Sequence, residues 1–176
     1  RGNEQVASAL LAVFSIGIGI GSLLCEKLSR GQVEIGLVPV GAIGMTVFAV
    51  DLYFACEGLA PPPADQVRWT LSAFLAEPAH LRILADLALL AASAGIYSVP
   101  MYALVQSRSG PAHRARIIAA VNILGAIFMV ASALFAAGLI WAGLSVTGIF
   151  LITGLLNALV AGYVFRLMPE YLLRFI

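Results

Sequence analysis

Charged residues are scarce in this sequence: they make up 11% of its 176 residues, whereas hydrophobic residues make up 61%. A water-soluble domain of this size needs more polar surface than that to cover its core. The basic residues are few and scattered, which excludes a nucleic-acid surface. With a mean hydropathy of +1.00, the chain is predicted to be an integral membrane protein whose main partner is membrane lipid.

Cysteine and histidine are also scarce, with two of each. Cys25 and Cys56 lie near opposite ends of two consecutive apolar runs. We expect about 30 Å between them across a bilayer, too far for a disulfide or a shared metal. His80 and His113 have no nucleophilic serine or cysteine nearby in a plausible pocket. The sequence therefore predicts no catalytic centre, metal site or cofactor, and we expect that this chain is not an enzyme.

The intervals between charges locate the transmembrane spans, because a bilayer core needs about 20 apolar helical residues. Three intervals are one span long, with Asp51 inside the second, and the interval 117–165 is long enough for two spans. Gly138, Trp141 and Gly143 mark the turn between those two. The chain is thus predicted to be an all-α, polytopic membrane protein with five transmembrane helices, at about 5–26, 34–56, 82–107, 115–139 and 143–167.

One long connection, the outer loop 57–81, separates the second and third spans. In it, Val67, Leu71, Phe74 and Leu75 have the spacing of one helical face, which predicts a short interfacial helix. In the third span, Pro100 indicates a kink with aromatic residues beside it.

Basic residues near the span ends predict the orientation, because they concentrate on the cytoplasmic side. Placing the first loop inside leaves residue 1 outside and the C-terminus in the cytoplasm. The predicted inner face then holds Lys27, Arg30, Arg108, Arg114, Arg116, Arg166 and Arg174, against Arg1, Arg68 and Arg82 outside. The start at Arg1 and the odd number of spans lead us to expect further helices upstream.

Glycines alternate at Gly17, Gly19 and Gly21 in the middle of the first span. A dinucleotide-binding loop needs G-x-G-x-x-G between a strand and a helix, and Ser22 occupies the place of the third glycine. Gly17 and Gly21 instead form a small-xxx-small pair, which lets a second helix approach closely in lipid. The pattern predicts helix packing.

Polar residues within the spans are the candidates for ligand contacts, since burying them is costly in a membrane. Asn122, Asn157 and Gln106 can each bind a ligand or form an interhelical hydrogen bond. Asp51 can reach the outer interface or face a cavity, and Tyr97 lies beside the predicted kink. No acid and base in one membrane plane stand out as a proton relay.

Two predicted inner loops resemble the major facilitator superfamily of transporters. CEKLSRGQ, which follows the glycine-rich span, is similar to the charged loop of that superfamily, and PAHRARIIAAVNI is similar to its stretch between the tenth and eleventh helices. Together with LRILADLALL and SVPMYALVQSRS, these segments look most like the lysophospholipid transporter branch. Some members of that branch are fused to a phospholipid acyltransferase and an acyl carrier protein ligase.

The resemblance implies that the chain is the C-terminal part of a transporter, helices eight to twelve of twelve, working with an N-terminal half. It implies lysophospholipid transport across the bacterial inner membrane by alternating access. Asn122, Gln106, Asp51 and Tyr97 are then the substrate-binding candidates. The implied cytoplasmic gating loop comprises Glu26, Lys27, Arg30, Arg114 and Arg116.

Two alternatives remain open at this point. The chain can be a drug or metabolite transporter of the same superfamily. It can also be the membrane portion of a bifunctional phospholipid acyltransferase, with the acyltransferase fused beyond Ile176 or acting as a neighbouring partner.

Overall fold

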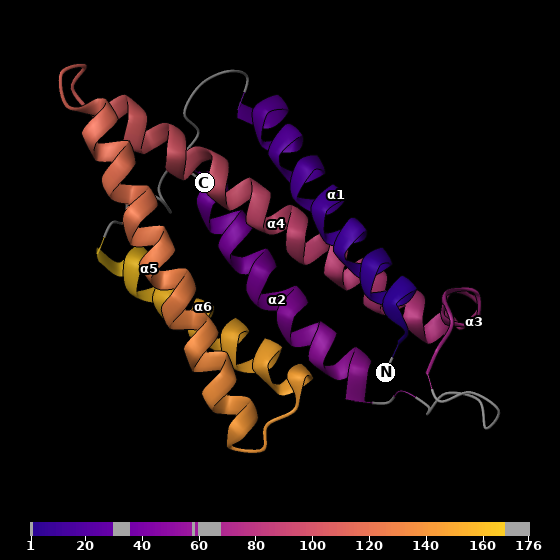
Figure 1. Cartoon of the computed structure of the whole chain (residues 1–176). Coiled ribbons are helices and arrows are strands. Elements are labelled where there is room, and N and C mark those ends of the chain that lie inside the picture. The colour runs from indigo at the N-terminus through magenta and orange to yellow at the C-terminus, as the bar shows by residue number, and fades with distance from the viewer. Residues whose placement is uncertain (1, 30–35, 58, 60–67, 168–176) are drawn as a thin grey trace.

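The computed structural model describes residues 2–29, 36–57, 59 and 68–167 (Figure 1). Five of the helices in these residues are long and apolar enough to cross a membrane, which confirms the expected all-α polytopic fold. The described part of the chain contains no strand longer than an isolated bridge. The helices are α1 (Glu4–Ser29), α2 (Leu37–Glu57), α3 (Leu71–Ala76), α4 (Pro78–Arg108), α5 (Arg114–Trp141) and α6 (Val146–Leu167).

The helix ends follow local sequence signals. The Asn3 carboxamide oxygen accepts a hydrogen bond from the Val6 amide at 3.0 Å and so caps α1. Between α5 and α6, Gly143 has a φ of 91°, a left-handed conformation that glycine adopts without strain. The predicted turn is present, but of the three residues only Gly143 lies in it, because α5 continues through Gly138 and Trp141.

The third span begins earlier than the predicted residue 82. Pro78 occupies the first turn of α4, where its missing amide hydrogen costs no intrahelical bond. Arg82 and Asp86 consequently lie inside this spanning helix. Both residues already lie within the predicted span 82–107, and the helix adds residues 78–81 at its start.

The short helix of the outer segment, α3, is only six residues long. Phe74 is buried and Leu75 is exposed, and Val67 lies outside the described residues. Phe74 stacks on His80 at the start of α4 with ring centroids 4.1 Å apart. The Trp69 carbonyl accepts a hydrogen bond from the Asn3 amide at 3.0 Å, which fastens this segment to the start of α1.

Helix α4 lies between α1 and α2 and packs extensively on both, and α6 packs on α2 (Figure 1). A Cβ atom built on Gly17 would lie 2.7 Å from the Ala88 carbonyl oxygen, and one on Gly21 would collide with the Ala92 carbonyl. The packing role predicted for these two glycines is confirmed, and their partner is α4. From the other side of the interface, Gly95 approaches the backbone of α1 equally closely.

The contact between α2 and α4 also depends on glycines that let the two backbones approach closely. A Cβ atom on Gly41 would lie 2.7 Å from the Tyr97 amide nitrogen and 2.8 Å from the Ser93 carbonyl oxygen. Gly44 lies against the Ser93 side chain. Lipid offers no hydrophobic driving force between helices, so such close backbone approach supplies the packing energy.

Helix α5 is the exception among the spans, because none of its residues is buried in the described structure. It touches α4 and α6 only sparsely, and Figure 1 shows it on the outside of the group. Cβ atoms on Gly125 and Gly138 would meet nothing within 4 Å.

Candidate functional site

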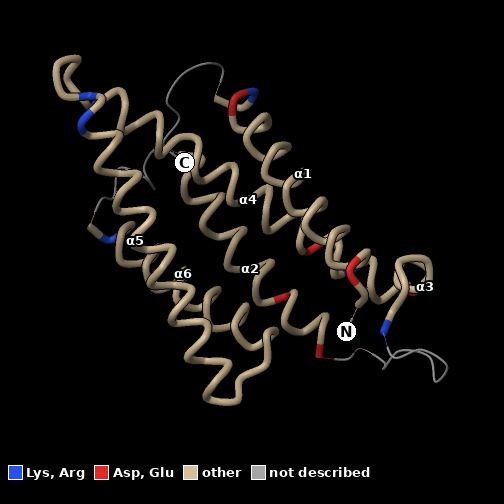
Figure 2. Tube along the Cα trace, in the orientation of Figure 1, with Lys and Arg blue, Asp and Glu red and all other residues tan. Residues whose placement is uncertain are grey.

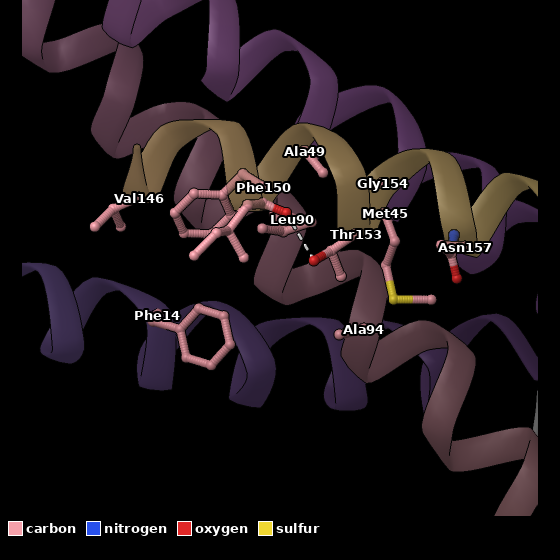
Figure 3. A pocket seen from close by; sticks show the side chains of 11 residues that line it. Phe14, Met45, Ala49, Leu90, Ala94, Val146, Phe150, Thr153, Gly154 and Asn157 are labelled. Atoms are coloured by element: carbon pink, nitrogen blue, oxygen red, sulfur yellow. Dashed lines mark hydrogen bonds between the residues drawn. The ribbon is translucent and has the colours of Figure 1, made fainter. Parts of the chain in front are cut away.

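An apolar cavity of about 420 Å³ lies among α1, α2, α4 and α6 (Figure 3). Figure 3 shows the rings of Phe14, from α1, and Phe150, from α6, directed into the same space. Nearly every lining group is carbon, and the polar side chains are those of Thr153 and Asn157. The lining residues are Phe14, Met45, Ala49, Leu90, Ala94, Val146, Ile149, Phe150, Thr153, Gly154 and Asn157.

Small residues hold α6 against α2 beside the apolar cavity. A Cβ atom on Gly154 would lie 3.0 Å from the Ala49 Cβ atom. Larger side chains at neighbouring positions, Met45 and Phe150, then surround the opening. The close contact of Gly154 with Ala49 fixes the position of α6. On α4, the small side chain of Ala94 leaves room for the apolar cavity.

Both polar side chains of the apolar cavity have hydrogen-bond partners. The Asn157 amide donates to the Ala42 carbonyl oxygen at 2.8 Å and to the Thr46 hydroxyl at 2.9 Å, and so links α6 to α2. The Thr153 hydroxyl donates to the Ile149 carbonyl oxygen of its own helix at 2.7 Å. Of the two roles open for Asn157, the interhelical hydrogen bond is the one observed.

The predicted substrate-binding residues are dispersed. Asn122 on α5 and Gln106 near the end of α4 are both exposed. Tyr97 lines a second, smaller cavity of about 30 Å³ between α2, α4 and α6, which Asn157 also borders. Asp51 lines neither of these cavities. The structure thus brings Tyr97 close to Asn157 and leaves Asn122, Gln106 and Asp51 apart.

Asp51 belongs to a charged group that the sequence did not reveal. Arg82 Nη2, on α4, donates to Asp51 Oδ1, on α2, at 2.5 Å. Arg82 Nε also lies 4.0 Å from Asp86 Oδ2, one turn further along α4. We name Asp51, Arg82 and Asp86 the carboxyl–arginine cluster. The spacing of Arg82 and Asp86 was a visible signal, but the link to Asp51 depends on how α2 and α4 pack.

The predicted gating residues lie at the end of the helices opposite the carboxyl–arginine cluster, where α1 ends and α5 begins. Figure 2 shows basic residues at these helix ends. Glu26, Lys27, Arg114 and Arg116 are exposed, and in the described part of the chain none of them forms an ion pair within 4.0 Å. Arg30 lies outside the described residues.

Comparison of the chain with protein-family models, with curated proteins and with solved structures finds no match in any of the three. The resemblance to the lysophospholipid transporters stays a prediction.

Proposed function

We propose that this chain takes part in moving lysophospholipid across the bacterial inner membrane by alternating access. The observation that carries the proposal is the apolar cavity, which four membrane-spanning helices border together. Its volume of about 420 Å³ falls within the range typical of small-molecule sites. Its carbon lining suits a single acyl chain, which gains free energy from leaving water and needs no hydrogen-bond partner.

The positions of the two polar side chains in the cavity indicate how a bound lysophospholipid would be oriented. Thr153 and Asn157 lie about two and three turns beyond Val146, whereas Val146 and Phe150 line the cavity nearer the start of α6. An acyl chain would therefore occupy the part near Phe150, and its polar end would point toward Asn157. Asn122, Gln106, Asp51 and Tyr97 remain predicted headgroup contacts in other states of the transport cycle.

Alternating access requires a second group of helices that moves against this one. In our proposal the basic helix ends around Lys27, Arg108 and Arg114 face the cytoplasm, as the distribution of basic residues favours. The exposed surface of α5 is then available for the second group, which would be the other half of the transporter.

A tryptophan at Ala94 tests the use of the cavity. Ala94→Trp places an indole in the space proposed for the acyl chain, while Ile16→Trp puts the same ring on the exposed surface of α1. In proteoliposomes we expect Ala94→Trp to slow the inward movement of a fluorescent lysophosphatidylethanolamine at least tenfold. Ile16→Trp should transport at nearly the wild-type rate. Rates are compared per folded molecule, as measured by monodisperse yield in detergent.

The outcomes separate the alternatives. Unchanged lysophospholipid transport by a folded Ala94→Trp variant would remove the apolar cavity from the proposal. Wild-type movement of a cationic amphiphilic dye without movement of lysophospholipid would favour a drug transporter. Movement of diacyl phospholipid at the same rate would contradict selection for a single acyl chain.

A further inference from the structure

The three side chains of the carboxyl–arginine cluster differ widely in their exposure to solvent. The side chains of Arg82 and Asp51 are 56% and 39% exposed, whereas that of Asp86 is 7% exposed. Asp86 Oδ2 has no hydrogen-bond partner among the described residues. Arg82 reaches both carboxyl groups, so Asp51 and Asp86 lie around one guanidinium.

The charges of this cluster do not balance if both acids are ionised. Two carboxylates face one guanidinium, and the guanidinium already bonds to Asp51. A buried carboxylate oxygen without a hydrogen-bond partner is costly, and two carboxylates that share a site disfavour double ionisation. Adding one proton removes the excess charge and gives the acid a donor hydrogen.

We propose that the carboxyl–arginine cluster is a proton-binding site, in which Asp86 holds one proton at neutral pH. In the binding step an O–H bond forms on the Asp86 carboxyl group while an O–H bond of a hydronium ion breaks and leaves water. The hydronium ion comes from the solvent at the exposed Arg82 and Asp51 side chains. Arg82 keeps its charge and its bond to Asp51. The site is independent of the substrate, so it stands whether or not lysophospholipid is transported.

Release of the proton has a structural consequence for the contact between α2 and α4. Once Asp86 is ionised, Arg82 has two carboxylates to neutralise, and its Nε atom is already 4.0 Å from Asp86 Oδ2. Moving the guanidinium toward Asp86 weakens its bond to Asp51 on α2. The protonation state therefore determines how firmly this end of α2 is tied to α4.

The surroundings contribute few other groups that titrate. From α2, Cys56 lies near Asp86 in addition to Asp51. The first turns of α1 carry only Glu4, which is exposed, and α3 carries no titratable residue. His80 precedes the cluster on α4, but its Nδ1 atom is bonded to the Phe74 carbonyl oxygen at 3.0 Å.

A metal ion is a less suitable ligand for this cluster. In the described part of the chain, no three histidine, cysteine, aspartate or glutamate side chains gather to hold a metal. Arg82 also occupies the position between the two carboxyl groups at which a cation would bind. Proton binding needs only the carboxyl pair.

Infrared difference spectroscopy tests the site directly. We expect the wild-type chain in lipid nanodiscs to show the carbonyl band of a protonated carboxyl group at neutral pH. Asp86→Asn should abolish the band, and Asp86→Glu should retain it at a shifted frequency. Glu77→Gln, which removes an exposed acid at the start of α4, should leave it unchanged. A band of wild-type size in Asp86→Asn would overturn the proposal.

Thermal unfolding provides a second measurement. If the folded chain holds a proton that the unfolded chain releases, the folded state binds more protons and stability must fall as pH rises. We expect the wild-type Tm to fall by at least roughly 5 °C between about pH 5 and pH 9 relative to Asp86→Asn. Parallel pH profiles for the two chains would overturn the proposal. If Asp86→Asn does not fold, the absence of any protonated-carboxyl band in wild type and Asp86→Glu alike would overturn it.

Discussion

Helices α4 and α5 differ in a way that hydrophobicity does not explain. By mean hydropathy α5 is the most apolar of the five spans and α4 the least, yet α4 is packed on both sides and α5 buries no residue. Lipid solvates apolar side chains as well as a protein interior does, so apolar character alone brings no helices together. What distinguishes α4 is that its small residues Ala88, Ala92 and Gly95 meet α1 at backbone distance. The glycines of α5, such as Gly125 and Gly138, would meet nothing within 4 Å if a Cβ atom were added.

The strongest test of this comparison is a leucine at Gly21. The new side chain would have to displace the Ala92 backbone carbonyl, which cannot move without separating α1 from α4. We expect Gly21→Leu to destabilise the folded state by roughly 3 kcal/mol and to reduce the folded yield sharply. The measurement is thermal unfolding in detergent, with the yield of monodisperse protein.

Two matched glycines serve as controls for that substitution. A Cβ atom on Gly19 of α1, or on Gly125 of α5, would meet nothing within 4 Å. Leucine at either position should change stability by less than about 1 kcal/mol, because it also improves helix propensity. Equal losses at Gly19 and Gly21 would show that close approach to α4 is not the cause.

A smaller effect is expected from the polar link between α6 and α2. Asn157→Ala removes two interhelical hydrogen bonds, to the Ala42 carbonyl oxygen and the Thr46 hydroxyl. Thr46 keeps its own bond to Ala42 at 3.2 Å, so no buried group is left unpaired. We expect a loss of about 1 kcal/mol in unfolding experiments. Thr153→Val, which removes a hydroxyl bonded only within α6, should cost less, and the reverse order would contradict the link.

The smallest effect on stability is expected at Asn122 on α5. Its side chain is exposed in the described structure, so Asn122→Ala should change the unfolding free energy by less than about 0.5 kcal/mol. If Asn122 meets the substrate headgroup, the variant should reach the membrane normally and transport lysophospholipid several-fold more slowly. An unchanged transport rate per folded molecule would remove Asn122 from the site.

The sequence alone specified the spans and their local features. The number of spanning helices, the glycine contact face at Gly17 and Gly21, and the turn at Gly143 all followed from residues close together in the chain. Each of these depends on short-range chemistry. The transfer of about 20 apolar residues into lipid adds up along one segment, and a reversal needs only a residue that tolerates a left-handed backbone.

Only the tertiary structure decided which helix surfaces meet. Small residues occur in several of the spans, so the pattern at Gly17 and Gly21 could not identify α4 as the partner. The apolar cavity and the contact of Asp51 with Arg82 likewise join residues far apart in the chain. Such pairings depend on how the shapes of two helix surfaces fit together, and the order of residues along the chain does not reveal that fit.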